Sequence, residues 1–203
     1  MAIEHADPQD ITSKVILKAQ DIEDKIRGLI RYIGDDPDRE GLVETPKRIR
    51  QMWETIFGGY HQEDPATFLG KTFELKEESG EMILLKNIEF YSTCEHHMLP
   101  FFGKVSIGYV PVHRVVGVSK LARVVESYAR RLQIQERMTT QIANTIWTAL
   151  HPLGVAVLVE AQHLCMIARG VEKQHSVMVT SAMYGLYRYN DAARSEFLSI
   201  IQK

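Results

Sequence analysis

The chain has 203 residues, of which 45% are hydrophobic and 25% are charged, and its formal net charge is −2. This length supports one sizeable core, or a core plus a small helical appendage, and the near-neutral charge excludes a general attraction to nucleic acid or to an anionic membrane. Two cysteines are too few for a disulfide framework.

Two helices are expected in the N-terminal part. Apolar residues recur at three- and four-residue steps from about Ser13 to Ile33, which predicts a helix with one buried stripe. Thr45-Pro46 predicts the start of a second helix, because threonine caps a helix and proline suits its first position. That helix should stop at Gly58-Gly59, and residues 61–70 should form a connection. We therefore expect residues 1–70 to be a helical extension.

After residue 70 the pattern changes to alternating apolar residues, which is typical of strands. The expected strands are residues 73–76, 82–92, 103–110, 115–118, 155–167 and 176–184. The expected helices are residues 119–131, 135–150 and 192–201. Strands in runs and helices in groups predict an α+β fold with a mainly antiparallel sheet, so residues 71–203 should form one catalytic domain.

Both cysteines lie beside histidine, in Cys94-Glu95-His96-His97 and in His163-Leu164-Cys165. Thiolates and imidazoles are the ligands of tetrahedral zinc sites, and a tight turn can present a C-x-x-H pair to one ion. We predict Cys94, His97 and Cys165 as three ligands, with a fourth position open for water. If residues 155–167 are extended, His163 and Cys165 share one face of the strand.

Two other interpretations of these residues stay open. His163 could be a fourth ligand that closes the site, or the cysteines could be small buried hydrophobic groups with no metal. In the preferred interpretation His96 and His163 are unligated imidazoles that move protons near neutral pH. That arrangement predicts metal-assisted hydrolysis.

A candidate anion site lies at the start of the helix expected from Ser119. Lys120 and Arg123 place two cations in its first turn, where a helix alone favours acidic residues, and a bound phosphate would explain them. Arg169 could supply another charge. The alternative is a solvated basic helix face.

Gln135-Glu136 opens the next expected helix. A carboxylate beside an amide can bind the N–H and NH₂ edge of guanine. The alternative is a stabilising acidic residue in a first helical turn.

Taken together, these segments resemble the GTP cyclohydrolase I family from about Ile16 onward. The matching blocks are Glu44-Thr-Pro-Lys-Arg48, Ser92-Thr-Cys-Glu-His-His-Met-Leu-Pro100, Gly117-Val-Ser-Lys-Leu-Ala-Arg123, Gln133-Ile-Gln-Glu-Arg137, Glu160-Ala-Gln-His-Leu-Cys-Met166 and Arg169-Gly-Val. The resemblance implies conversion of GTP and water to 7,8-dihydroneopterin triphosphate and formate, the first step of tetrahydrofolate and pterin biosynthesis. It also implies the tunnelling fold, ββααββ with helices on one side of the sheet.

The resemblance further implies one Zn²⁺ per subunit on Cys94, His97 and Cys165, with His96 and His163 as the catalytic histidines. It implies that Gln135 and Glu136 hold guanine, and it assigns the triphosphate to Ser119, Lys120, Arg123, Arg169 and Arg48. Arg48 would come from a neighbouring subunit of a homodecamer of two pentamers, with active sites at subunit interfaces. One departure is Gln51, where some relatives carry a basic residue, so phosphate binding would depend more on Arg48, Arg50 or Lys47.

Two other functions fit part of the pattern. One is another tunnelling-fold enzyme acting on a purine or pterin, and the other is a non-catalytic zinc-binding module with a closed site. The start of the chain lacks the pattern of a signal peptide, and no apolar run reaches the roughly 18 residues of a membrane helix, so we expect a cytoplasmic protein without membrane or nucleic-acid partners. The sequence points to no particular regulatory protein.

Overall fold

The computed structural model describes residues 8–75 and 80–202, with side chains from Gln20 onward. The chain divides into two compact units, Met1–Thr55 and Ile56–Lys203. Among the described residues, no helix is both long enough and apolar enough to cross a membrane.

The first unit is built on two helices, α1 (Pro8–Tyr32) and α2 (Thr45–Ile56). Ile26 and Ile30 lie one turn apart on α1 and are buried, as the apolar stripe predicts. Arg50 on α2 donates to Glu23 on α1 at 2.7 Å. The second helix begins at the expected residue, whereas α1 begins before Ser13.

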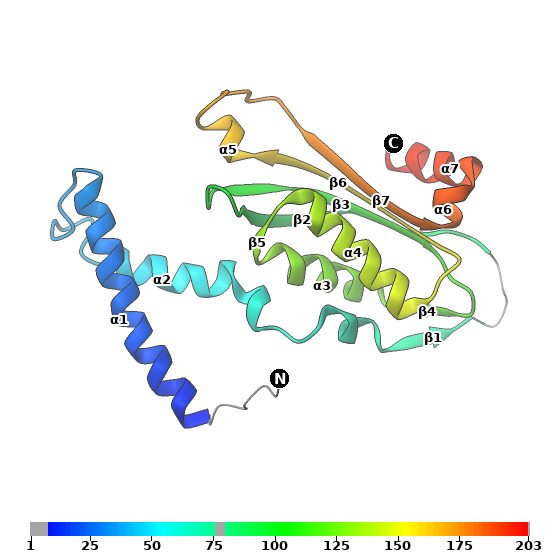
Figure 1. The fold of residues 1–203 in the computed structure, drawn as a ribbon. Coiled ribbons are helices and arrows are strands. Elements are labelled where there is room, and N and C mark those ends of the chain that lie inside the picture. The colour runs from blue at the N-terminus through cyan, green and yellow to red at the C-terminus, as the bar shows by residue number, and fades with distance from the viewer. Residues whose placement is uncertain (1–7, 76–79, 203) are drawn as a thin grey trace, which may run out of the picture. The chain divides into compact units, whose positions relative to one another are not determined.

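The second unit contains a five-stranded sheet in the order β5-β2-β3-β6-β7 (Figure 1). Its long antiparallel strands are β2 (Ile83–Cys94), β3 (Pro100–Val110), β6 (Gly154–His163) and β7 (Met178–Gly185). The short β5 (Leu132–Gln133) pairs with β2 in parallel. A separate small sheet joins β1 (Thr72–Glu74) to β4 (Arg114–Val116). The expected mixed fold with a mainly antiparallel sheet is confirmed.

Helices α3 (Val118–Ala129) and α4 (Gln135–Leu150) cover one face of the large sheet (Figure 1). Alternate residues of β6, namely Val155, Val157 and Val159, are fully buried in the core cluster that also includes residues of both helices. The strand period of two explains this, because every second side chain points to the helices. The core therefore lies between the sheet and this helix pair.

The expectation that helices lie on only one side of the sheet is wrong at one end. There α6 (Leu186–Tyr189) and α7 (Asp191–Ile201) form a second cluster in which Tyr187 and Phe197 pack with Val110 and Ala156. Ala156 alternates with Val155 and Val157 along β6, so this cluster lies on the opposite face. The C-terminal helices thus close one end of the face that α3 and α4 leave open.

Several element boundaries differ from the expectations. The stretch expected as a connection contains two short 3₁₀ helices, η1 (Gly58–His61) and η2 (Pro65–Leu69), and η2 packs on α3 and α4. These turns belong to the second compact unit, while the division at residue 70 stays a prediction. The expected first strand reaches Lys76, which lies outside the described residues.

The strand expected to run to Ile167 ends at His163 and continues as the short helix α5 (Leu164–Ile167). Pairing with β7 stops at Ala161 and pairing with β3 stops at His163, opposite Phe101. Beyond that point an extended chain would have no ladder partner on either side, so the backbone closes a helical turn in which Ala168 N–H donates to Leu164 O at 2.9 Å. The expected common strand face for His163 and Cys165 is therefore wrong.

Candidate functional site

The turn between β2 and β3 presents two of the candidate metal ligands. Cys94 N–H donates to Leu99 O and Met98 N–H donates to Cys94 O, both at 2.8 Å, so the turn is closed on itself. Met98 has a φ of 53°, which lets the chain reverse within these few residues. Cys94 and His97 consequently lie on the same side of the turn, with Cys94 Sγ 3.8 Å from His97 Nδ1.

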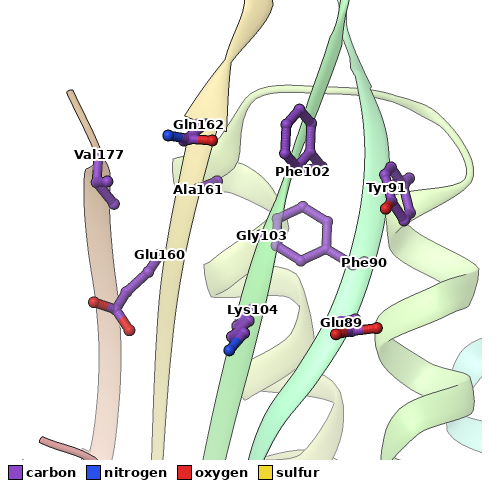
Figure 2. A pocket seen from close by; sticks show the side chains of 10 residues that line it. All are labelled: Glu89, Phe90, Tyr91, Phe102, Gly103, Lys104, Glu160, Ala161, Gln162 and Val177. Atoms are coloured by element: carbon purple, nitrogen blue, oxygen red, sulfur yellow. The ribbon is translucent and has the colours of Figure 1, made fainter. Parts of the chain in front are cut away.

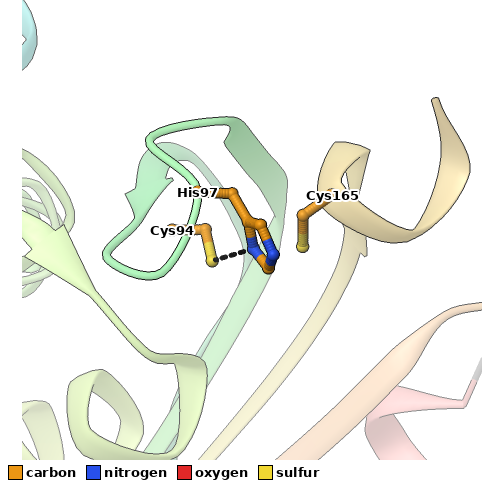
Figure 3. Close-up of side chains that lie close together, drawn as sticks. All are labelled: Cys94, His97 and Cys165. Carbon is orange, nitrogen blue, oxygen red and sulfur yellow. Dashed lines mark hydrogen bonds between the residues drawn. The ribbon is translucent and has the colours of Figure 1, made fainter. Parts of the chain in front are cut away.

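Cys165 reaches the same place from α5, immediately after β6 (Figure 3). One ligand atom from each of Cys94, His97 and Cys165 lies within 4.8 Å of the others. Burial raises the pKa of the Cys165 thiol, and the nearby Cys94 raises it further. Two thiols and an imidazole this close are donors that a tetrahedral zinc ion uses, so the three residues fit a metal ion.

His96 lies in the same turn but outside this group. Its side chain is exposed, and its Nδ1 lies 3.9 Å from Cys94 Sγ. An exposed imidazole beside a metal position can still carry protons.

A cavity of about 500 Å³ lies next to the group of Cys94, His97 and Cys165. His163, Cys165 and Arg169 are among its lining residues, and Val171 and Met178 contribute apolar surface. The structure thus brings the expected proton donor, a metal ligand and one expected phosphate ligand to a single hollow.

His163 is held on two sides. Its ring stacks on Phe101 with centroids 4.6 Å apart and an interplanar angle of 5°, and its Nε2 lies 2.8 Å from Gln135 Oε1. Burial lowers the pKa of His163, and the negative charge of Glu136 acts in the opposite direction. The ring is therefore fixed in position before any substrate binds.

The two adjacent residues at the start of α4 have opposite surroundings. Gln135 is fully buried, and its amide is bonded within the chain, whereas Glu136 is exposed. One residue step rotates a helix by about 100°, so neighbours in sequence point in different directions. Only Glu136 is open to a ligand in this arrangement.

Arg137 is a residue that the sequence patterns did not single out. It donates to Gln133 Oε1 and Leu132 O, both at 3.0 Å. It also forms an ion pair with Glu95, in the turn of Cys94 and His97. This pair holds the pKa of Glu95 below its usual value. Arg137 therefore ties the turn of Cys94 and His97 to β5 and to α4. Gln133 lies in β5 and not in the helix, so no helical spacing in the sequence indicated this contact.

The expected phosphate residues of α3 lie elsewhere in the same chain. Helix α3 begins at Val118 after its N-cap Gly117, one residue before the expected start at Ser119, and Lys120 N–H donates to Gly117 O at 2.8 Å. The first turn holds no acidic residue. Arg123 lines a different cavity, together with His61 and Glu126.

The strand directions explain this separation. Strand β3 runs from the end of the sheet near Cys94 to Val110, and β4 follows it. Helix α3 then runs back toward β5, which pairs with β2 at Cys94. The C-terminal end of α3 thus lies near the turn of Cys94 and His97. Its N-terminal end lies about one helix length, roughly 18 Å, away.

Arg48 and its basic neighbours lie in the first unit. Arg48 is exposed and forms no ion pair with the side chains described between Gln20 and Gln202, whereas Arg50 is bonded to Glu23 and Glu54. Arg50 is thus less available for a ligand than Arg48.

Another hollow, of about 380 Å³, lies on the sheet face away from α3 and α4 (Figure 2). A cross-strand row of Glu89, Lys104 and Glu160 crosses it in register. None of the candidate metal or catalytic residues lines this hollow, but it shares Ala161 and Val177 with the cavity beside Cys165.

Comparison with known proteins gives the family. A sequence profile described as GTP cyclohydrolase I matches residues 22–202. The chain belongs to the GTP cyclohydrolase I family. The resemblance inferred from the sequence blocks is confirmed, and the chain is an enzyme of this family.

Several curated relatives are similar over nearly their whole length. "GTP cyclohydrolase 1" of Wolinella succinogenes is 58% identical over 181 residues, covering 89% of this chain and 96% of the relative. "GTP cyclohydrolase 1" of Methylococcus capsulatus is 56% identical over 85% of this chain and 92% of the relative. The protein of the same name from Dehalococcoides mccartyi strain BAV1 is 54% identical over 90% of this chain and 96% of the relative.

Proposed function

We propose that this chain hydrolyses GTP to 7,8-dihydroneopterin triphosphate and formate, as the first step of tetrahydrofolate and pterin biosynthesis. The observation that carries the proposal is the group of Cys94, His97 and Cys165 within 4.8 Å, next to a cavity lined by His163 and Arg169. Family membership supplies the substrate, and the residues supply the means to bind and hydrolyse it.

Cys94, His97 and Cys165 would hold one Zn²⁺ per subunit. When bound, the ion supplies Lewis-acid activation of water near neutral pH. His163 donates a proton to guanine N7, which makes C8 electrophilic; one hydrolysis opens the five-membered ring and a second releases C8 as formate. His96, exposed beside the turn, serves the later proton transfers that open the ribose and close the new ring.

Glu136 would bind the guanine edge. It is exposed at the start of α4, and its charge acts on His163, which supports a position beside the same substrate. Arg169 lines the cavity and would contact the triphosphate. Binding energy from the phosphates then positions C8 at the metal.

The remaining phosphate residues support a site shared between chains. Ser119 and Lys120 lie at the start of α3, about 18 Å from its other end near Cys94, and Arg123 lines a separate cavity, so these three residues would serve the site of a neighbouring copy. We propose that Arg48 also reaches a neighbouring copy.

An exposed edge of the sheet also supports assembly. Strand β7 is the last strand of the order in the described chain. Val177, which directly precedes it, and Val179 within it are 52% and 54% exposed. An apolar edge of this kind calls for a lateral partner. We propose a tunnelling fold assembled into a homodecamer of two pentamers, with active sites at subunit interfaces.

The test is incubation of the zinc-loaded protein with GTP, with formate and pterin absorbance measured together. We expect both products in equal amounts and one zinc per chain. Zinc without turnover would support a non-catalytic zinc-binding module. Turnover of a different purine or pterin, with GTP untouched, would support another tunnelling-fold activity.

A further inference from the structure

The orientation of the Gln135 side chain is determined by its surroundings. Its amide nitrogen, which carries two hydrogens, lies 3.0 Å from both Val159 O and Met178 O and 3.1 Å from Thr180 Oγ1. Two of these partners are backbone carbonyls, which can only accept, so the amide nitrogen must face them. The amide oxygen is then the atom that faces His163.

This orientation fixes which nitrogen of His163 carries a hydrogen. Gln135 Oε1 lies 2.8 Å from His163 Nε2, and an amide oxygen can only accept, so Nε2 must be the donor. The same holds for the neutral and the charged ring. Stacking on Phe101 fixes the plane of the ring. Nε2 is therefore committed to Gln135, and this hydrogen bond leaves Nδ1 uncommitted.

We propose that Gln135 is a positioning residue that holds the His163 ring beside the cavity, with Nε2–H donating to the amide oxygen of Gln135. The proposal rests on the function proposed above and narrows it, because it assigns Gln135 to the histidine and leaves recognition of guanine to Glu136. Gln135 is fully buried, and its donors are committed to β6 and β7, so it cannot also bind a base without breaking these contacts.

The first experiment is Gln135→Met, which keeps the length of the side chain and removes both polar groups. We expect kcat for GTP to fall about 10- to 100-fold, the range of a misplaced general acid, with KM and the calorimetric Kd for GTP changed by less than about twofold. The control is Thr148→Val on the same helix. Thr148 is exposed and donates to Asn144 O within α4, away from Gln135 and its partners, so its kcat should stay within about twofold.

A double-mutant cycle separates positioning from base recognition. In a His163→Ala background, Gln135→Met should cause no further loss of residual turnover, because its effect passes through the missing ring. An equal loss in both backgrounds would overturn the proposal. A raised KM and Kd for GTP with unchanged kcat would also overturn it, and would make Gln135 a base-binding residue.

A spectroscopic measurement on the unmutated protein does not depend on how the variants fold. Nitrogen-15 solid-state spectra of histidine-labelled protein, with His163 assigned by comparison with His163→Ala, should show Nε2 protonated. A bare Nε2 with a protonated Nδ1 would overturn the proposal. Failure of the wild type to release formate from GTP would instead overturn the proposed function, and this spectrum would still report the ring orientation.

Discussion

At the scale of single residues, the two thiols have no substitute in the chain, since Cys94 and Cys165 are its only cysteines. Cys165→Ser should lose zinc and turnover together, because the variant removes a thiolate from a site with three protein ligands. Metal content by elemental analysis and formate release check both effects. His96→Ala is the control and should keep one zinc; a Cys165→Ser protein that holds zinc and works at the normal rate would contradict the ligand assignment.

Two buried tyrosines differ in whether the hydroxyl has a partner. Tyr109 OH accepts from Val116 N–H at 3.2 Å, whereas no described residue bonds to the buried hydroxyl of Tyr187. Tyr109→Phe should therefore destabilise the protein by about 0.5–1.5 kcal/mol at pH 7, while Tyr187→Phe should cost little or stabilise it. Denaturant unfolding of both variants tests this; equal losses would contradict it.

The same residues predict an alkaline limit to stability. Burial raises the pKa of Tyr187 above its ordinary value of 10.0, and the charge of Glu196 raises it further. The folded state then keeps a proton that the unfolded chain loses, so this contribution to stability is full below pH 10 and declines as pH rises above it. The melting temperature of Tyr187→Phe should therefore fall less steeply than that of the wild type as pH rises from about 9 to 11.

At the scale of elements, Arg137 connects the metal turn to β5 and α4. Arg137→Met should weaken zinc binding about tenfold, the range seen when a residue that supports metal ligands is lost, because the turn of Cys94 and His97 loses its anchor. Competition with a chelator measures this affinity. Arg130→Met is the matched control, because Arg130 pairs with Glu126 within α3. Equal zinc affinity in both variants would show that Arg137 does not support the site.

The close approach of β3 and β6 depends on Gly103. A Cβ at this position would lie 1.9 Å from Glu160 O and 2.7 Å from Ala161 Cα, so the two strands would have to separate beside His163. Gly103→Ala should destabilise the fold by about 1–3 kcal/mol and lower its melting temperature. Gly28→Ala in α1, where a Cβ meets nothing within 4 Å, should instead stabilise its helix by about 0.5–1 kcal/mol. A melting temperature of Gly103→Ala at or above that of the wild type would contradict this.

Local pattern predicted the helices better than the ends of the strands. Helix α4 has the expected bounds, because its buried stripe recurs with the helical period. The end of β6 depends on where β3 and β7 stop, which no local pattern in residues 155–167 contains. The helical period could also have placed Gln135 inside, since it lies three and four residues before the buried Met138 and Thr139. Its adjacency to Glu136 suggested a shared role instead.

At the scale of the whole molecule, sequence motifs identified the chemistry but not which chain supplies each part. Cys94 and Cys165 lie together in one chain, as their neighbouring histidines suggested. Lys120 and Arg123 belong to the same set of motifs, yet the path through β3, β4 and α3 carries Lys120 to the other end of the sheet and Arg123 to a different cavity. Motif order in a sequence contains no distances, so this separation required the fold.

The separation predicts that two inactive variants restore each other. Lys120→Ala/Arg123→Ala would damage the phosphate site that a chain offers to its neighbour, and His163→Ala would damage the chain's own cavity. In randomly mixed oligomers at equal amounts, about a quarter of interfaces would join an intact helix start to an intact His163, so about a quarter of wild-type formate release should return.

The control distinguishes a shared site from one contained in a single chain. Wild type is mixed with an equal amount of a chain carrying all three substitutions. If each site is shared between two chains, about a quarter of the activity of an all-wild-type oligomer should remain; if each chain holds its whole site, about half should remain. The subunits are dissociated, mixed and reassembled, and mixing is verified by mass spectrometry of the intact assembly. If mixing Lys120→Ala/Arg123→Ala with His163→Ala restores no activity and the control keeps half, each active site would be confined to one chain. Recovery in the first mixture and a quarter in the second would place the start of α3 in the active site of a neighbouring subunit.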